Sequence, residues 1–274
     1  MNFIFALSIE IPGLKDAVKA MLHHIQGKHE ISPFYDADAL ESAVPGISAG
    51  IQTVAMTVLS IMAILEFTSA IARYGGDTSM GLKVISFTMF KISLLATIAK
   101  KGTSIAHDII GEGHALLLSV KQSTEVHDMG QGSADALVDN ASTGELFGAM
   151  IMLMIPWLLA WVPFIAMKVV LAVVDIQVYL LASFAALPLA FLTHSETRSI
   201  AISYLKKLFA LAITPVVVFA LIAMFNALTE PIEMGGDSLF GWIGGNFIDL
   251  VAAPILLTVL IVSSSSLANK IFGD

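Results

Sequence analysis

The sequence predicts an all-α membrane protein: a polytopic membrane helical bundle with five transmembrane helices, or six if one ambiguous block also crosses, plus amphipathic helices. Of the 274 residues, 57% are hydrophobic and 13% are charged, whereas a soluble domain carries about 25% charged residues. The apolar residues fall in blocks of about 20, the length that crosses a hydrocarbon layer of about 30 Å. A membrane β-barrel would need segments of about 10 residues with alternating polarity. No such alternation runs through the chain, so helices are favoured.

Residues 1–45 are predicted to form an amphipathic N-terminal segment. Between residues 10 and 30, apolar side chains recur at spacings of three and four, which places them on one helix face. These side chains are Ile11, Leu14, Val18, Met21 and Ile25. Because the face is narrow, we expect this helix to lie on the membrane surface or against a partner helix. The first residues lack the basic start and the long apolar run of a signal peptide, so we expect them in the mature protein.

Residues 46–101 combine one clear span with one ambiguous block. The clear span covers about 47–72 and carries a single charge, Glu66. The ambiguous block, 84–99, is short for a span, contains Lys91 and is flanked by further lysines. It can cross the bilayer, which gives six spans, or lie along the interface, which gives five. Five spans keep the basic residues around this block together on the cytoplasmic side, so we favour five.

Residues 102–144 form the most polar stretch of the chain. They hold six acidic residues and three histidines, together with several glycines. Glycine and small polar residues in such clusters mark loops. We therefore expect one or two amphipathic helices and a flexible connection, all outside the hydrocarbon layer.

Residues 145–274 are predicted to form a C-terminal membrane bundle. The stretch 146–193 is apolar over a length far beyond one membrane thickness. A helical hairpin that turns between about Val162 and Asp175 is the economical interpretation, and a single long tilted helix is the alternative. Two further spans are predicted at about 208–228, where Pro215 can kink the helix, and at about 240–262.

The basic residues orient this bundle, because cytoplasmic loops of membrane proteins are enriched in Lys and Arg. Arg198, Lys206 and Lys207 are predicted to lie in the cytoplasm as topology determinants that contact phospholipid, with docking of a cytoplasmic ATPase as the alternative. The acidic turn at 230–237 then lies outside. Counting back through the predicted hairpin places residues 100–145 in the cytoplasm as well.

Four ionisable residues lie near the middle or the ends of apolar blocks. They are Glu66, Lys91, Asp175 and Asp249. A charge inside a bilayer costs from a few kcal/mol upward, so such groups face a bundle interior, a wet cavity or a partner. We predict a polar lining or contacts between subunits. For Glu66 and Asp175 the alternative is a helix-end side chain that reaches the headgroups.

The sequence shows no constellation of residues typical of enzyme chemistry. The chain has no cysteine, so it has no thiolate ligand or cysteine nucleophile. His23, His24 and His29 are poorly spaced for one metal ion, and no glycine pair is followed by the Lys-Ser/Thr of a phosphate loop. The net charge of −8, with 14 scattered Lys and Arg residues, argues against direct sequence-specific binding of nucleic acid. We predict no catalytic residues, no metal and no cofactor.

Two stretches resemble a known family. In residues 58–111 a span with an acidic residue is followed by a polar turn, a Lys-bearing amphipathic block and a helix. In residues 178–222 a span reaches Leu187-Pro188-Leu189, then a short polar link with Thr-Arg, then a Tyr-Leu-Lys-Lys entry into the next span. This layout resembles the TrbL-like family, the polytopic inner-membrane channel subunit of type IV secretion systems, in its compact Gram-positive form.

The resemblance implies a non-enzymatic subunit of a conjugative or effector-export machine in the cytoplasmic membrane. Such subunits assemble with copies of themselves and with other secretion components, including ATPases, around the translocation path. We therefore predict a channel or scaffold subunit of a type IV secretion machine. The alternatives are a small-molecule transporter or permease subunit, for which inverted repeats would be expected, and a membrane enzyme, for which clustered polar groups inside the membrane would be expected.

Overall fold

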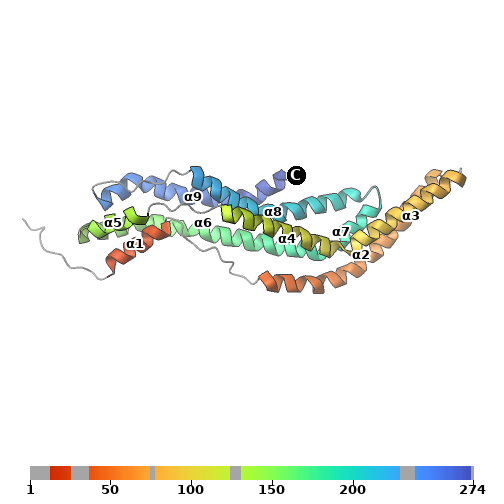
Figure 1. Ribbon diagram of the computed structural model, residues 1–274, viewed down its shortest axis with the longest axis horizontal. Coiled ribbons are helices and arrows are strands. Elements are labelled where there is room, and N and C mark those ends of the chain that lie inside the picture. The colour runs from red at the N-terminus through yellow and green to blue at the C-terminus, as the bar shows by residue number, and fades with distance from the viewer. Residues whose placement is uncertain (1–12, 26–36, 75–77, 124–130, 229–237, 273–274) are drawn as a thin grey trace, which may run out of the picture. The chain divides into compact units, whose positions relative to one another are not determined.

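The computed structural model describes residues 13–25, 37–74, 78–123, 131–228 and 238–272. All regular secondary structure in these residues is helical (Figure 1). The elements are α1 (Leu14–Ile25), α2 (Ala37–Tyr74), α3 (Thr78–Lys100), α4 (Gly102–Ser123), α5 (Gln131–Asn140), α6 (Thr143–Phe184), α7 (Ala186–Ala190), the 3₁₀ helix η1 (Phe191–Thr193), α8 (Arg198–Leu228) and α9 (Leu239–Ile271).

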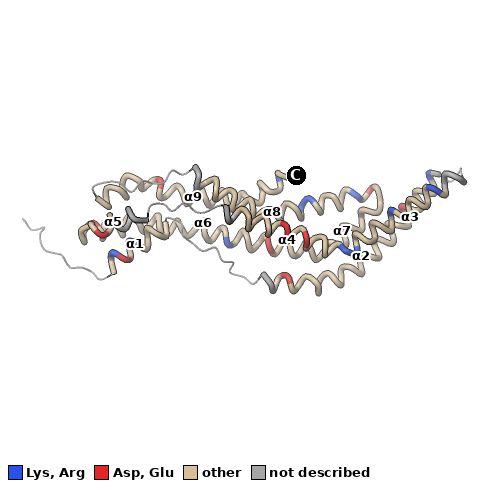
Figure 2. The backbone as a smooth tube through the Cα atoms, viewed as in Figure 1, with Lys and Arg blue, Asp and Glu red and all other residues tan. Residues whose placement is uncertain are grey.

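Five helices in the described part of the chain are long and apolar enough to cross a membrane. Their candidate spans are Leu40–Arg73, Leu82–Lys100, Thr143–Phe184, Arg198–Phe225 and Leu239–Ile271. Long stretches of α6 and α9 carry no Lys, Arg, Asp or Glu (Figure 2). The prediction of an all-α polytopic membrane protein is therefore confirmed, but the five spans differ from those expected.

The predicted hairpin within 146–193 is wrong, because α6 runs without a break through the segment expected to turn. Between Val162 and Asp175 the sequence holds no glycine, asparagine or serine to form a turn. Pro163 is accommodated inside the helix, as prolines in membrane helices often are. The ammonium of Lys168 lies 4.7 Å from the centre of the Phe164 ring, one turn away, so this cation finds a cation–π contact on the helix itself.

The single long helix, which was the alternative interpretation, is therefore correct. Its start is defined by a capping box, in which Ser142 and Glu145 each accept a hydrogen bond from the other's backbone N–H at 3.4 and 3.0 Å. The count that placed residues 100–145 on the same side as Arg198 depended on the hairpin and loses its basis.

The ambiguous block 84–99 lies in α3, which begins six residues earlier and contains a candidate span from Leu82 to Lys100. Its length and composition now favour the crossing alternative. The polar stretch 102–144 contains α4 and α5, while the flexible connection predicted between them and the acidic turn at 230–237 lie largely outside the described residues.

The chain divides into two compact units, which are described separately. Unit 1 comprises residues 1–33, 122–170 and 218–264, and unit 2 comprises residues 34–121, 171–217 and 265–274. In unit 1, α1 buries its apolar stripe against α5, α6 and α9. The buried cluster includes Leu14, Val18, Leu22, Val138, Leu146, Leu153, Leu239 and Ile243. The N-terminal amphipathic helix was predicted to lie on the membrane surface or against a partner helix, and α1 packs against helices of its own chain.

In unit 2, α2 and α3 form a helical hairpin, and α7 and η1 pack against both of them (Figure 1). Leu59 and Ala99 are buried there together with Leu189 and Ala190. Farther along α2 and α3 the large apolar side chains are exposed, for example Ile64 and Phe87, as expected for helices that face lipid.

The backbone of α4 approaches that of α8 closely in unit 2. A Cβ atom placed on Gly113 would lie 2.6 Å from the carbonyl oxygen of Ala212, which no side chain could tolerate without movement. The helix α4 continues through Gly111 and Gly113. The absence of a side chain at Gly113 allows the two helices to touch.

Candidate functional site

Glu66 and Lys91 meet between the two arms of the α2–α3 hairpin. The Lys91 ammonium donates a hydrogen bond to Glu66 Oε1 at 2.6 Å. The Glu66 side chain is 16% exposed and that of Lys91 is 36% exposed. Both residues lie within the candidate spans of their helices, so an unpaired charge at either position would be costly.

The second carboxylate oxygen of Glu66 contacts the segment that follows η1. His194 Nδ1 lies 3.0 Å from Glu66 Oε2, and the backbone N–H of Ser195 donates to the same oxygen at 3.4 Å. The His194 side chain is 14% exposed. We call these residues, Glu66, Lys91, His194 and Ser195, the polar joint, because they connect the hairpin to the link before α8.

The break between α6 and α8 positions His194. After Phe184 the chain forms only the short helices α7 and η1, and His194 then adopts extended backbone angles (φ −105°, ψ 135°). The hydroxyl of Thr197 donates to the carbonyl oxygens of Phe191 at 3.0 Å and His194 at 3.3 Å. The single hydroxyl hydrogen is shared between these two acceptors and links Thr197 back to η1 and to His194.

Both oxygens of the Glu66 carboxylate on α2 are satisfied by groups from two other segments, α3 and the link that follows η1. Removing one partner of a buried ion pair leaves an uncompensated charge and is strongly destabilising, whereas the intact pair adds little net stability. The arrangement therefore specifies which segments lie together more than it adds to total stability. Chemically, the arrangement can hold these segments in position.

Of the four predicted ionisable residues, the structure brings together only Glu66 and Lys91. Asp175 is half-buried on α6 in unit 2, and Asp249 is exposed on α9 in unit 1. Arg198, Lys206 and Lys207 are exposed on α8. No structural finding tests the roles predicted for these residues, which stay predictions.

Sequence reasoning missed His194 as a partner of Glu66. The histidine was assigned to a polar link, and nothing in the local pattern relates it to a carboxylate 128 residues earlier. The only available signal was its place directly after the Leu-Pro-Leu break, where an apolar span ends and the backbone must turn.

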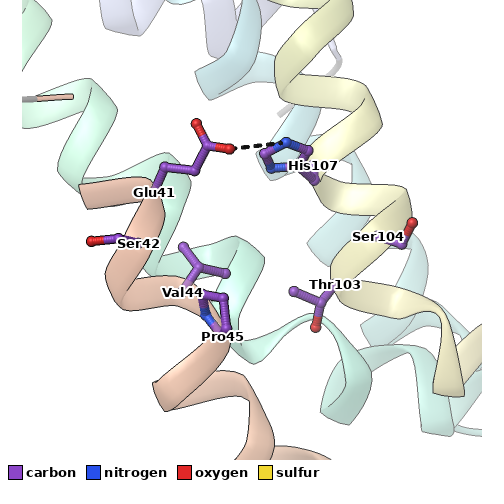
Figure 3. A pocket seen from close by; sticks show the side chains of 7 residues that line it. All are labelled: Glu41, Ser42, Val44, Pro45, Thr103, Ser104 and His107. Atoms are coloured by element: carbon purple, nitrogen blue, oxygen red, sulfur yellow. Dashed lines mark ion pairs between the residues drawn. The ribbon is translucent and has the colours of Figure 1, made fainter. Parts of the chain in front are cut away.

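A second polar place is a cavity of about 600 Å³ between the start of α2 and the start of α4 (Figure 3). His107 Nε2 lies 3.5 Å from Glu41 Oε1, and both side chains are 52% exposed. The hydroxyl of Ser104 points away from the His107 ring (Figure 3), so these residues form no nucleophile–base pair. The cavity is an open groove lined by both polar and apolar side chains, and its described residues show no catalytic geometry.

Of the three histidines considered for a metal site, His24 packs against aromatic rings of α6, and His29 lies outside the described residues. The His24 ring lies 4.2 Å from the Trp161 ring and 6.0 Å from the Trp157 ring, measured between centroids, which fastens the end of α1 to α6. Among the described residues, no group of three or more His, Asp or Glu side chains could hold a metal ion.

One family model matches the chain. It describes the TrbL/VirB6 plasmid conjugal transfer protein and covers residues 70–265, well over half of the sequence. Lys91 and His194 lie inside the matched region, and Glu66 lies four residues before it. Comparisons with curated proteins and with solved structures found no match.

The family is a structural component of multi-subunit transfer systems, which agrees with the resemblance inferred from the sequence and not with a solute transporter. Its membrane association also fits the five apolar helices. The chain belongs to the TrbL/VirB6 plasmid conjugal transfer protein family, and it is a multi-pass membrane subunit of a conjugal transfer or type IV secretion system.

Proposed function

We propose that the chain is a channel or scaffold subunit of the cytoplasmic membrane, which assembles with copies of itself around the translocation path and works with partner ATPases. The observation that carries this proposal is a stripe of exposed apolar side chains on α6. The stripe comprises Phe147, Ile151, Ile155, Leu158, Val162, Ile165, Val169, Val173, Ile176, Leu180 and Phe184. Its members follow one another at spacings of three and four, so they share one helix face.

The stripe is longer than lipid alone can cover. From Phe147 to Phe184 the helix extends about 55 Å at 1.5 Å per residue. The hydrocarbon layer is about 30 Å thick, and a helix tilted by about 40°, near the upper limit observed, would keep only about 39 Å inside it. About ten residues of the helix, with about three members of the stripe among them, therefore extend beyond the hydrocarbon, and these exposed apolar side chains need protein to cover them. Copies of the chain, as implied by the TrbL-like resemblance, would provide that cover.

The polar joint gives such a subunit a defined shape in unit 2. Glu66 connects α2, α3 and the link before α8. This contact holds the α2–α3 hairpin in one position within unit 2, so its exposed apolar side chains form a fixed surface. Asp249, exposed beside Ile248 on α9, is our candidate for a polar lining or a contact between copies. Asp175 on α6 is a second candidate.

Site-specific cross-linking tests the assembly, and the absence of cysteine makes the natural chain a ready background. Single cysteines replace the exposed Ile151, Ile165 or Ile176 of the stripe, and a bismaleimide is added to native membranes. We expect covalent dimers and larger species from at least one stripe position.

The matched controls place cysteine on the opposite face of α6, at Leu153 or Val174, which are 0% and 3% exposed. They should give monomers. If every stripe variant stays monomeric and the native mass in nanodiscs is that of one chain, the assembly proposal is wrong, although membership of the family would stand.

We also propose an orientation. If α6 and α3 each cross once, then Arg198, Lys206, Lys207 and Lys270 lie in the cytoplasm, while the segment between α5 and α6 lies outside. Alkaline phosphatase, which is active only outside the cytoplasm, should be active when inserted after Ala141 and inactive at the C-terminus. Activity at the C-terminus, or inactivity at Ala141, would contradict this orientation.

A further inference from the structure

The first turns of α8 carry cations and exposed apolar side chains on the same helix face. Arg198, Ile202, Lys206 and Phe209 follow one another at spacings of four, four and three, so they lie in one row along the helix. All four are exposed, and Lys207 beside them is exposed as well.

The end of α9 adds to this row within unit 2. The Phe272 ring stacks on the Phe209 ring, with centroids 6.2 Å apart and planes inclined by 20°. This contact brings the last turn of α9, with Lys270 and the exposed Ile271, beside the start of α8. A fourth cation, 63 residues away from Lys207 in the sequence, thereby joins the other three. We call this surface the basic–aromatic face.

The charge on this surface is of one sign. Residues 198–217 and 265–272 contain these four cations and no carboxylate. The nearest acidic residues along the chain are Glu196, whose carboxylate lies 3.8 Å from His194 Nε2 in the link before α8, and Asp274, which follows the second segment and lies outside the described residues. An anion approaching the basic–aromatic face would therefore be attracted without opposition from these two segments.

We propose that the basic–aromatic face binds the headgroup of an anionic phospholipid, with its acyl chain along Ile202, Phe209 and Ile271. Ammonium and guanidinium groups bind phosphate strongly, and each cation near an anionic membrane surface contributes about 1 kcal/mol. An acidic protein segment would neutralise the cations but would leave the interleaved apolar side chains in water. A phospholipid covers both, so the side-chain pattern favours the lipid.

This inference goes beyond the proposed assembly and does not depend on it. It also differs from a general excess of positive charge on the cytoplasmic side, because it assigns a role to an uncharged contact. If Phe272 holds the end of α9 against α8, removing its ring should weaken lipid binding although no charge changes. A purely electrostatic surface would not respond to that substitution.

Lipid titration of the full-length chain tests the proposal. The detergent-solubilised protein is titrated with phosphatidylglycerol or with phosphatidylcholine, and bound lipid is counted by native mass spectrometry. We expect tighter binding of phosphatidylglycerol. The double variant Lys206→Gln/Lys207→Gln should weaken that binding about 25-fold, since two cations contribute about 1 kcal/mol each and about 1.4 kcal/mol corresponds to tenfold. Phe272→Ala should also weaken it.

The matched control is Lys100→Gln/Lys101→Gln, another exposed pair of adjacent lysines, which should keep the affinity of the natural chain. Monodisperse elution from a sizing column checks that each variant is folded. The proposal is overturned if the two lipids bind equally, if the Lys206/Lys207 variant binds like the natural chain, or if the control pair loses as much. If Phe272→Ala binds phosphatidylglycerol with unchanged affinity, the proposed contribution of α9 is wrong. If the face binds an acidic peptide in place of phosphatidylglycerol, the proposed ligand is wrong.

Discussion

Each unit of the chain fastens one of its outer elements with a lysine–carboxylate pair, but the surroundings of the two pairs differ. In unit 1, Lys19 lies 2.9 Å from Asp139 and connects α1 to α5, with the Asp139 side chain 57% exposed. In unit 2, Lys91 lies 2.6 Å from Glu66 inside the α2–α3 hairpin, with the Glu66 side chain 16% exposed. Both pairs join a lysine ammonium to a carboxylate, but the carboxylate in unit 1 is exposed and the carboxylate in unit 2 is largely buried.

The difference shows which force holds each element. In unit 1 the apolar stripe of α1 is buried in a cluster with three other helices, so burial stabilises the contact and an exposed, screened ion pair adds little. In the most apolar part of α2 and of α3 only 11% of the residues are buried, and the apolar contacts with α7 are concentrated around Leu59 and Ala99. There we infer that the polar joint contributes to the arrangement beside these apolar contacts.

The largest effect should come from breaking the polar joint. Glu66→Ala removes the carboxylate and leaves the Lys91 ammonium without its partner in an apolar hairpin, so we expect the free energy of unfolding to fall by about 3 kcal/mol. Unfolding in a denaturing detergent, followed by circular dichroism, measures the loss.

The control for this variant is Glu196→Ala, which removes a carboxylate that also lies near His194 but is 86% exposed. It should change the stability by well under 1 kcal/mol. The double variant Glu66→Leu/Lys91→Leu should regain most of the loss, because two apolar residues can replace a buried ion pair. If the double variant has as low a free energy of unfolding as Glu66→Ala, then the loss in Glu66→Ala does not come from the unpaired Lys91 charge.

Burial in unit 1 gives the next largest effect. Leu22 is 1% exposed within the cluster that holds α1, and Leu22→Ala should lower the free energy of unfolding by about 2–3 kcal/mol. Leu116→Ala makes the same change on α4 at a residue that is 45% exposed and should cost under about 1 kcal/mol. Protease sensitivity of α1 reports the local effect. Equal losses for both would mean that burial does not hold α1.

The close approach of α4 to α8 gives a smaller effect in unit 2. Gly113→Ala places a Cβ atom 2.6 Å from the Ala212 carbonyl oxygen, and the overpacking should cost about 1–3 kcal/mol. Gly111→Ala, two residues away in the same helix, meets nothing within 4 Å. It should stabilise α4 by about 0.5–1 kcal/mol, because alanine is the better helix former. Changes of the same sign at both positions would contradict the close approach.

The fold class could be predicted from the sequence because hydrophobic length and composition are properties of single segments. The sequence marks the boundary of a helix less clearly, as the failure of the hairpin prediction shows. An apolar run of that length permits one helix or two, and Pro163 and Lys168 suggested a turn. The cation–π contact of Lys168 with Phe164 removes the need for the charge to reach water. Side-chain contacts of this kind leave no trace in hydropathy.

The candidate site was predictable only in part, for a related reason. Glu66 and Lys91 were recognisable one at a time, since a charge inside an apolar block requires a partner. Which partner it finds depends on tertiary packing, and the approach of His194 to Glu66 follows from the break at α7 and η1. The pattern of exposed residues at the start of α8 likewise gave no indication that Phe272 would stack on Phe209.

The smallest effect should come from the exposed ion pair in unit 1. The hydrogen bond from Lys19 lowers the pKa of Asp139 below its ordinary value of 3.8. A lowered pKa in the folded state gives stability that is present above the ordinary pKa and is lost as the pH falls through the lowered one. Asp139→Asn should therefore remove a small contribution to the free energy of unfolding at neutral pH and abolish the acid dependence of α1 release, measured by limited pepsin cleavage.

High salt should have the same effect in unit 1 as this substitution, because an exposed ion pair is screened, while leaving the Glu66–Lys91 pair intact. If salt loosened both pairs equally, the two surroundings would not differ in the way the comparison requires.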